Sequence, residues 1–386
     1  MIRQAKALAK DGGSSVHPPR RRRAVGKFRA AGVDAMLVTN PVEVGYLTGF
    51  TGDDSFLLLG AGWACLVTDG RFTEQAAKEC GDIERHIRNG SMESAVAKAL
   101  RGRGVRKLGF EPKHVTVKLR QDLADKLKGK KLVEVSAVVS ALRQCKDDGE
   151  LAIMRRAIRI AEKAFKEMLA LGAKGWVGRT ERDLAAELEY RMRRCGADAP
   201  GFPTILAAGA HGSLPHYRPG STRVRPGQAV LVDWGARVEG YCSDLTRVVF
   251  TGTIPAKLRE IYEVVRRAQE AGIAAIRPGV GCKAVDAAAR RVIVEAGYGE
   301  RFGHGLGHGL GREVHEAPGL GKLSTTRLKS GMVVTVEPGI YLPGIGGVRI
   351  EDDVLVTASS ARRLSSLPRD IDAMRELMRS GAILAA

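Results

Sequence analysis

Four acidic residues occupy two segments that have the pattern of β-hairpins. Asp233 and Asp244 flank a turn at residues 237–240, and Glu337 and Glu351 flank the turn-rich "LPGIGG". In a symmetric register each pair lies directly across its hairpin, with Cβ atoms about 4.5–5.5 Å apart. Carboxylates that close repel one another, so a cation is expected between them. One such acid could be a buried salt-bridge partner, but four on two apolar hairpins favour a metal site.

A histidine-rich segment, "FGHGLGHGLGREVHEAP" at residues 302–318, could supply a further ligand. His304, His308 and His315 have the spacing of one helical face, but glycine stands at every second position from Gly303 to Gly311. Each glycine would cost a helix interior roughly 1 kcal/mol relative to alanine, so an extended or looped segment is predicted. Histidine in such a segment is a metal ligand, an acid–base group or an anion contact, unless the segment is only a polar surface turn.

Four carboxylates with one imidazole form a set of ligands suited to Mn²⁺, Co²⁺, Fe²⁺ or Zn²⁺. Five such ligands are enough for two ions about 3.5–4 Å apart, the spacing of two-metal hydrolases. Such ions can hold a hydroxide and polarise a carbonyl group. The residue types therefore predict hydrolysis of an amide bond.

Residues 24–136 have the alternating pattern of an α/β domain. Short apolar runs predict strands, and polar amphipathic runs predict helices between them. The strands are expected at 34–40, 55–60, 64–70, 83–87, 107–112 and 131–136, and the helices at 71–79, 91–102 and 117–129.

The second half of the chain, residues 137–386, has a different pattern. A long helix is expected from about Ala137 to Leu171, and a Thr-x-x-Asp capping signature opens another at Thr180. Further helices are predicted at 255–276 and 282–297, with antiparallel strands between them. An α+β domain fits this order better than a doubly wound sheet.

The composition is that of a globular protein of two domains: 386 residues, 44% hydrophobic and 27% charged. The six scattered cysteines suit a reducing cytoplasm, and no apolar run approaches the ~18 residues of a membrane span. Residues 1–23 are basic, lack the apolar core of a secretory signal and are expected to be a disordered extension. The net charge of +19 raises nucleic acid as a partner, but few aromatics accompany the charge. We therefore do not expect nucleic-acid binding.

The acid and histidine set resembles that of the pita-bread metallopeptidases, the family of aminopeptidase P, prolidase and methionine aminopeptidase. The resemblance extends to "LPHYRPG", which contains His216, and to "VRIED", which contains Arg349. It implies a ribonuclease H-like α/β N-terminal domain and an α+β pita-bread catalytic domain. The metal ligands that it implies are Asp233, Asp244, His308, Glu337 and Glu351.

The resemblance also implies which branch of the family the chain represents. Methionine aminopeptidases generally lack the N-terminal domain and tend to have His-Thr where this chain has Asp352 and Asp353. Creatinase has both domains but not the metal ligands. An Xaa-Pro peptidase is therefore expected, either aminopeptidase or dipeptidase. The alternatives are a methionine-type aminopeptidase and a non-catalytic basic binding protein on this fold. No role is evident for His211.

The expected reaction is hydrolysis of small peptides with proline at the second position. His315 and His216 would hold the substrate carbonyl or the oxyanion, with His304 beside them. Glu337 would also carry a proton to the departing nitrogen, and Arg349 would orient the carboxylates unless it is a surface charge. Two divalent ions, Mn²⁺ first, are expected as cofactors, and a homodimer or larger homo-oligomer as the assembly.

Overall fold

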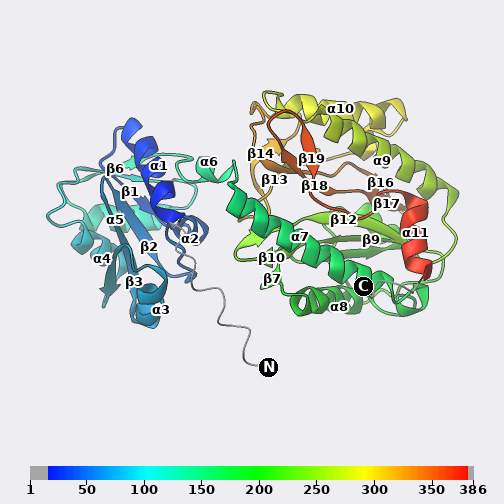
Figure 1. The fold of residues 1–386 in the computed structure, drawn as a ribbon, viewed down its shortest axis with the longest axis horizontal. Helices are drawn as coiled ribbons and strands as arrows, with labels where there is room; N and C mark the ends of the chain where they lie inside the picture. Colours follow the sequence, from blue (N-terminus) through cyan, green and yellow to red (C-terminus); the bar gives the residue numbers. More distant parts are fainter. Residues whose placement is uncertain (1–15, 381–386) are drawn as a thin grey trace. The chain divides into compact units, whose positions relative to one another are not determined.

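The structure is a computed structural model that describes residues 16–380 of the chain. Contacts between Cα atoms divide the chain into two compact units, one ending at Leu142 and the other beginning at Arg143 (Figure 1). The division falls later than the one expected after residue 136. None of the helices in the described part of the chain is long and apolar enough to cross a membrane.

The first unit is built on a mixed six-stranded sheet with the order β4-β3-β2-β1-β5-β6. β1 pairs antiparallel with β2 and parallel with β5. Alternate residues of β1 enter two different cores, Met36 and Val38 on one face and Ala35 and Leu37 on the other. The sheet is therefore covered on both faces, as the predicted α/β pattern requires. Its strands are β1 (Ala35–Val38), β2 (Phe56–Gly60), β3 (Trp63–Asp69), β4 (Glu84–Arg88), β5 (Lys107–Phe110) and β6 (Lys131–Glu134).

The helices of the first unit are α1 (His17–Ala30), α2 (Pro41–Thr48), α3 (Thr73–Glu79), α4 (Met92–Ala99) and α5 (Val117–Lys126). Helix α2 was not predicted, although Asn40 and Pro41 carry its start signal. The Asn40 side chain accepts a hydrogen bond from the N–H of Val42, and Pro41 stands at the first helical position.

The expectation of a disordered extension as far as residue 23 is wrong for residues 17–23. Helix α1 begins at His17, and Arg20 and Arg21 are buried. Arg21 donates a hydrogen bond to the Leu47 carbonyl at the end of α2 and forms an ion pair with Asp82. These contacts hold α1 against α2 and Asp82, so the arginine run forms part of the domain. Residues 1–15 lie outside the described part of the chain.

The second unit contains antiparallel strands between helices. Its helices are α6 (Ser140–Arg143), which spans the division, α7 (Asp148–Leu169), α8 (Glu181–Arg194), α9 (Ala256–Ala275), α10 (Cys282–Glu295) and α11 (Ile371–Ser380). Its strands are β7 (Ala199–Pro200), β8 (Ile205–Ala208), β9 (Ala229–Trp234), β10 (Ala236–Val238), β11 (Tyr241–Cys242), β12 (Leu245–Phe250), β13 (Gly307–Gly309), β14 (Glu316–Leu320), β15 (Val333–Val336), β16 (Gly339–Leu342), β17 (Gly346–Arg349), β18 (Asp352–Val356) and β19 (Ala361–Arg363).

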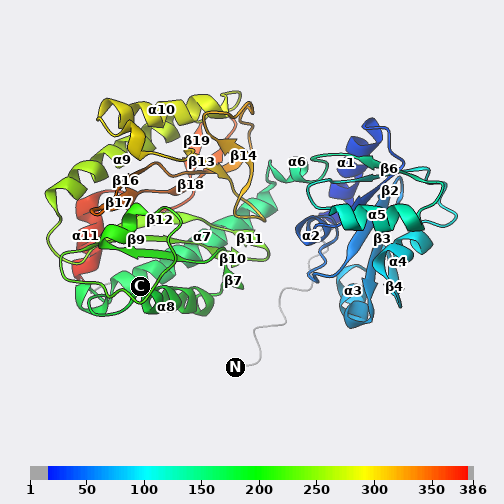
Figure 2. The same cartoon turned by 180° about the vertical axis from the view of Figure 1, so that it is seen from behind.

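Two helix layers enclose these strands, with α9 and α10 on one side and α7 and α8 on the other (Figure 2). In β9, Ala229 and Leu231 enter the core with α9 and α10, whereas Val230 and Val232 enter the core with α7 and α8. By this alternation Asp233 points to the side of α9 and α10. The α+β class predicted for the second half of the chain is confirmed.

The single helix expected from Ala137 to Leu171 is wrong. The segment contains the short α6 and then α7, which begins with a capping box formed by Asp147 and Glu150. Between them Cys145 forms an isolated β-bridge with Met332. The helical periodicity of the sequence is correct for α7, but pairing with the sheet interrupts the helix before it.

The first hairpin has a different register from the one expected. Asp233 lies opposite Thr246 rather than Asp244, because the turn is centred on Glu239 and Gly240, which both have positive φ. Two residues with positive φ form the turn type that matches the twist of a tight hairpin. The offset is two residues, so both aspartates still point to the same face.

The second hairpin has the expected register. Gly339 pairs with Arg349 in β16 and β17, and Val336 pairs with Asp352 in β15 and β18. Both pairs follow one continuous register around Gly344, and this register places Glu337 opposite Glu351.

Candidate metal centre

One cavity of about 410 Å³ in the second unit is lined by all the metal-ligand and catalytic residues expected from the sequence. Its lining combines strands of both hairpins with the glycine- and histidine-rich segment and the loop after β8. The predicted residues in its wall are His216, Asp233, Asp244, His304, His308, His315, Glu337, Arg349 and Glu351.

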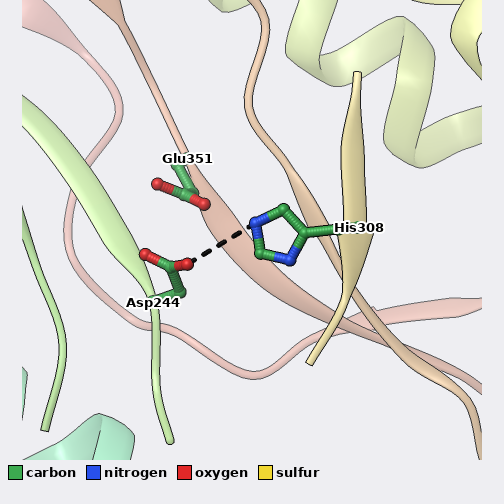
Figure 3. Close-up of side chains that lie close together, drawn as sticks. All are labelled: Asp244, His308 and Glu351. Atoms are coloured by element: carbon green, nitrogen blue, oxygen red, sulfur yellow. Dashed lines mark ion pairs between the residues drawn. The ribbon is translucent and has the colours of Figure 1, made fainter. Parts of the chain in front are cut away.

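The most compact group in the cavity comprises Asp244, His308 and Glu351. Potential ligand atoms of these three side chains lie within 4.8 Å of one another and point to a common centre from three different strands or strand ends (Figure 3). His308 Nε2 is 3.7 Å from Asp244 Oδ2 and 3.3 Å from Glu337 Oε1. Glu337 therefore borders the group, which does not include Asp233.

A bridge between the hairpins brings these strands together. Thr246 of β12 forms an isolated antiparallel bridge with Glu351, and the Glu351 N–H donates to the Thr246 carbonyl. The Thr246 hydroxyl also donates to Glu351 Oε2 at 2.6 Å. Thr246 is thus a structural partner of the site that sequence reasoning missed.

Arg349 is the one buried guanidinium among the residues that line the cavity. It binds Asp233 Oδ2 through Nη2 at 2.5 Å and donates to Thr246 Oγ1 and to the Tyr341 hydroxyl, each at 3.0 Å. Its side chain is 3% exposed, which excludes the alternative of a plain surface charge. One guanidinium cannot balance the charge of four carboxylates, three of them buried and Glu337 partly buried.

Because burial is not offset by a balancing positive charge, the pKa of each of the four carboxyl groups is raised. Burial raises the pKa of Asp233 and raises the pKa of Glu337 to about 8. Burial and then the neighbouring acids raise the pKa of Asp244 and of Glu351 well above their usual values. Asp233 Oδ1 is also buried without a hydrogen-bond partner in the described part of the chain. A buried acid-rich site of this kind fits divalent cations, which would compensate its charge.

Burial lowers the pKa of three histidines of the cavity, His304, His308 and His315, so they are suited to contact a cation or a substrate as neutral imidazoles. Burial lowers the pKa of His308 to about 4, and a neutral imidazole can bind a metal. Its Nδ1 lies 3.1 Å from the Gly309 carbonyl, which leaves Nε2 facing the carboxylates. The His315 ring lies 4.2 Å from the His308 ring, and His304 Nε2 lies 2.9 Å from the Tyr341 hydroxyl.

The glycines of the histidine segment allow the backbone to approach neighbouring strands. A Cβ atom at Gly307 would lie 2.1 Å from the Thr335 carbonyl oxygen, and one at Gly309 would lie 2.4 Å from the Ala317 carbonyl oxygen. The segment is extended at β13, as expected from its glycine content. Only glycine lets the strand that carries His308 pack this closely on both sides.

A cluster of opposite charges anchors the end of the same segment. Glu316 follows His315 directly and binds Arg143 Nη2 at 2.6 Å and Lys146 Nζ at 2.7 Å. The three side chains are 7%, 2% and 1% exposed. Arg143 also binds Glu313, which is 35% exposed. No local pattern in the sequence pointed to this cluster.

Asp352 and Asp353, where methionine aminopeptidases tend to have His-Thr, are both fully buried. Asp352 binds Arg247 Nη2 at 2.8 Å, and Asp353 Oδ2 accepts the Asp244 N–H at 3.2 Å. Both acids therefore support the strands behind the site. Neither lines the cavity.

Comparison with known proteins places both units in known families. Residues 152–358 match the model of metallopeptidase family M24, and residues 20–145 match that of the creatinase/prolidase N-terminal domain. The chain belongs to metallopeptidase family M24.

Relatives of the M24 chain include named Xaa-Pro dipeptidases. The Xaa-Pro dipeptidase of Pyrococcus horikoshii is 36% identical over 88% of this chain and 94% of its own length. An uncharacterized peptidase of Bacillus subtilis is 41% identical over 89% of this chain and 97% of its own length.

Solved structures of the family superpose closely on this chain. The Xaa-Pro dipeptidase from Bacillus anthracis has a TM-score of 0.88 at 38% identity and covers 92% of this chain and 99% of its own. An X-Pro aminopeptidase from Thermotoga maritima has a TM-score of 0.83 at 36% identity, with coverage of 89% and 99%.

The raised pKa values predict how metal should affect stability. A carboxyl group whose pKa is raised in the folded state stabilises the fold at any pH below its pKa in the unfolded state. This contribution is lost as the pH rises through the pKa of the folded state. For Glu337 the stabilisation is lost between pH 4.5 and about pH 8. We expect the stabilisation conferred by Mn²⁺ to grow across this window, measured by thermal unfolding of chelated and Mn²⁺-reloaded protein. Parallel pH profiles of the two forms would contradict the expectation.

Proposed function

We propose that this M24 peptidase hydrolyses the Xaa-Pro bond at the N-terminus of peptides or in dipeptides. The observation that carries the proposal is the convergence of three buried carboxylates, the partly buried Glu337 and one neutral imidazole in one cavity, with a single buried guanidinium as counter-charge. The names of relatives, Xaa-Pro dipeptidase and X-Pro aminopeptidase, support the choice of bond.

The metal ligands in this proposal are Asp233, Asp244, His308, Glu337 and Glu351. They would hold two divalent ions, and a set dominated by carboxylates favours Mn²⁺, with Co²⁺, Zn²⁺ or Fe²⁺ as alternatives. When bound, such ions polarise a carbonyl and lower the pKa of a water molecule. The short contact of Asp233 with Arg349 keeps that carboxylate oriented, and its Oδ1 remains without a protein partner.

The remaining cavity residues would act on the peptide. His216 and His315 would donate to the substrate carbonyl oxygen and to the negative charge that develops on it. Glu337 would pass a proton to the proline nitrogen, which leaves poorly unless it is protonated. Arg349 would hold Asp233 in position, and His304 would hold the Tyr341 hydroxyl.

A panel of peptides tests the substrate class. We expect the Mn²⁺-loaded enzyme to cleave Gly-Pro, Ala-Pro or an Xaa-Pro-Xaa tripeptide, and to leave Met-Ala-Ser largely intact. The relative rates on dipeptide and tripeptide decide between dipeptidase and aminopeptidase. Preference for Met-Ala-Ser would move the assignment to the methionine branch. Salt-sensitive oligonucleotide binding with no cleavage of any peptide would favour a binding protein.

The setting of the enzyme is part of the proposal. All six cysteines are free, which fits the reducing cytoplasm. A homodimer or larger homo-oligomer is proposed from the family resemblance, and analytical ultracentrifugation measures it. The enzyme's partners are then small peptides and copies of itself, without a role for nucleic acid.

A further inference from the structure

A fully buried carboxylate lies behind the loop that carries His216. Glu181 stands at the start of α8, directly after the capping residue Thr180, and none of its surface is exposed. It does not line the cavity. A buried carboxylate is costly unless hydrogen bonds satisfy it, so the arrangement of its partners is informative.

Within residues 16–380, Glu181 accepts four hydrogen bonds, and all four come from one stretch of chain, residues 208–220. Oε1 accepts the Ala208 N–H at 2.9 Å and the His211 Nδ1–H at 2.8 Å. Oε2 accepts the Tyr217 hydroxyl at 2.7 Å and the Gly220 N–H at 3.2 Å. One side chain thus holds both ends of the loop and two of its rings.

The two rings form a stack beside His216. The centroids of His211 and Tyr217 are 4.4 Å apart, with an angle of 27° between the ring planes. Tyr217 follows His216 in the chain, and both line the cavity. The histidine at 211, for which the sequence offered no role, is therefore a link between Glu181 and the cavity wall.

The opposite side of the loop packs on the hairpin that carries Arg349. A Cβ atom at Gly347 would lie 2.1 Å from the Gly212 carbonyl oxygen, and one at Gly346 would lie 2.9 Å from the Gly209 carbonyl oxygen. The loop is therefore confined between α8 and β17. Because the loop packs closely on β17, there is no gap on that side into which it could move if its contacts with α8 changed.

His216 itself is exposed to the cavity and makes no hydrogen bond to another side chain or backbone group in the described part of the chain. The position of its imidazole is consequently set by its backbone. Glu181 holds the backbone on both sides of it, at Ala208 and at Gly220, and the hydroxyl of the next residue, Tyr217.

We propose that Glu181 is a positioning residue for His216 and acts through the stacked pair of His211 and Tyr217. The inference rests on the proposed function, in which His216 contacts the substrate carbonyl. It adds a residue outside the cavity that determines how well this contact is made. A displacement of about 1 Å in such a contacting group can lower the reaction rate by about 100-fold.

A double-mutant cycle tests the proposal on the Mn²⁺-loaded protein. We expect Glu181→Gln to lower kcat/KM for Ala-Pro at least tenfold in the native background, with kcat falling more than KM rises. In a His216→Ala background the same change should alter kcat/KM less than about twofold, since coupled residues are not additive. Glu187→Gln, on the same helix, is the control and should change neither background. Equal losses from Glu181→Gln in both backgrounds would overturn the proposal.

A second measurement does not depend on hydrolysis. Removing the Tyr217 hydroxyl by Tyr217→Phe keeps the ring and deletes one of the four hydrogen bonds, so it serves if Glu181→Gln fails to fold. We expect the NMR signal of the His216 ring, assigned by its absence in His216→Ala, to shift or broaden in either variant. An unchanged signal would overturn the inference. A changed signal in a protein that cleaves no Xaa-Pro peptide would refute only the proposed function.

Discussion

Replacing Asp244 by Asn, or His308 by Ala, is expected to abolish most Xaa-Pro cleavage and to lower the content of bound metal. These residues belong to the compact group whose ligand atoms lie within 4.8 Å of one another. The loss should exceed the roughly 10–100-fold that removal of a partner outside the first coordination shell costs. Steady-state kinetics and elemental analysis of the purified variants measure both effects.

The matched control for these variants is Glu300→Gln, which changes an exposed carboxylate outside the cavity. It should retain both metal and activity. Chelation of the native enzyme should abolish cleavage, and Mn²⁺ or Co²⁺ should restore it. Full activity in chelated protein, or in Asp244→Asn without metal, would contradict the assignment of the centre.

Replacing Glu316 by Ala is expected to destabilise the second unit by about 3–5 kcal/mol, the cost of removing one partner from a buried ion pair. Lys146 would lose a carboxylate 2.7 Å away, and Arg143 would lose the buried one of its two carboxylate partners, Glu316, and keep the more exposed Glu313. An arginine cannot lose its proton to escape burial. Urea denaturation of the metal-free protein measures the difference in unfolding free energy.

Glu313→Ala provides the control within the same cluster. Glu313 is 35% exposed and, among the described residues, its side chain binds Arg143, which would keep Glu316, so its removal should cost under about 1 kcal/mol. Similar losses for the two variants would show that burial does not determine the strength of this cluster. Because Glu316 follows His315 directly, Glu316→Ala should also lower the kcat of the protein that remains folded.

The register of the second hairpin could be predicted because its turn was visible in the sequence. The glycines and proline between Leu342 and Gly347 define the centre of symmetry, and Gly344 has the positive φ expected of a turn. Counting seven residues in each direction from Gly344 then places Glu337 opposite Glu351. In the first hairpin, Glu239 takes a positive φ that a non-glycine residue rarely adopts, so the centre of the turn was placed one residue too early and the expected pairing is displaced by two residues.

Networks formed between distant segments could not be predicted in this way. Glu181 and His211 are separated by a helix and two strands, and Glu316 lies far along the chain from Arg143. Each residue taken alone has the appearance of an ordinary surface charge. Their pairing depends on which faces the helices bury, and local periodicity does not contain that information.

The sequence by itself determined the two domains, the antiparallel character of the second and the chemistry of the candidate centre. These follow from local patterns: alternation in strands, glycine in turns, and acids placed among core residues. Only the tertiary structure decided which oxygen and nitrogen atoms meet. The bridge from Thr246 to Glu351 and the burial of Arg349 bring the hairpins together. Contacts of this kind join residues about a hundred positions apart, so their geometry arises from packing of the whole unit.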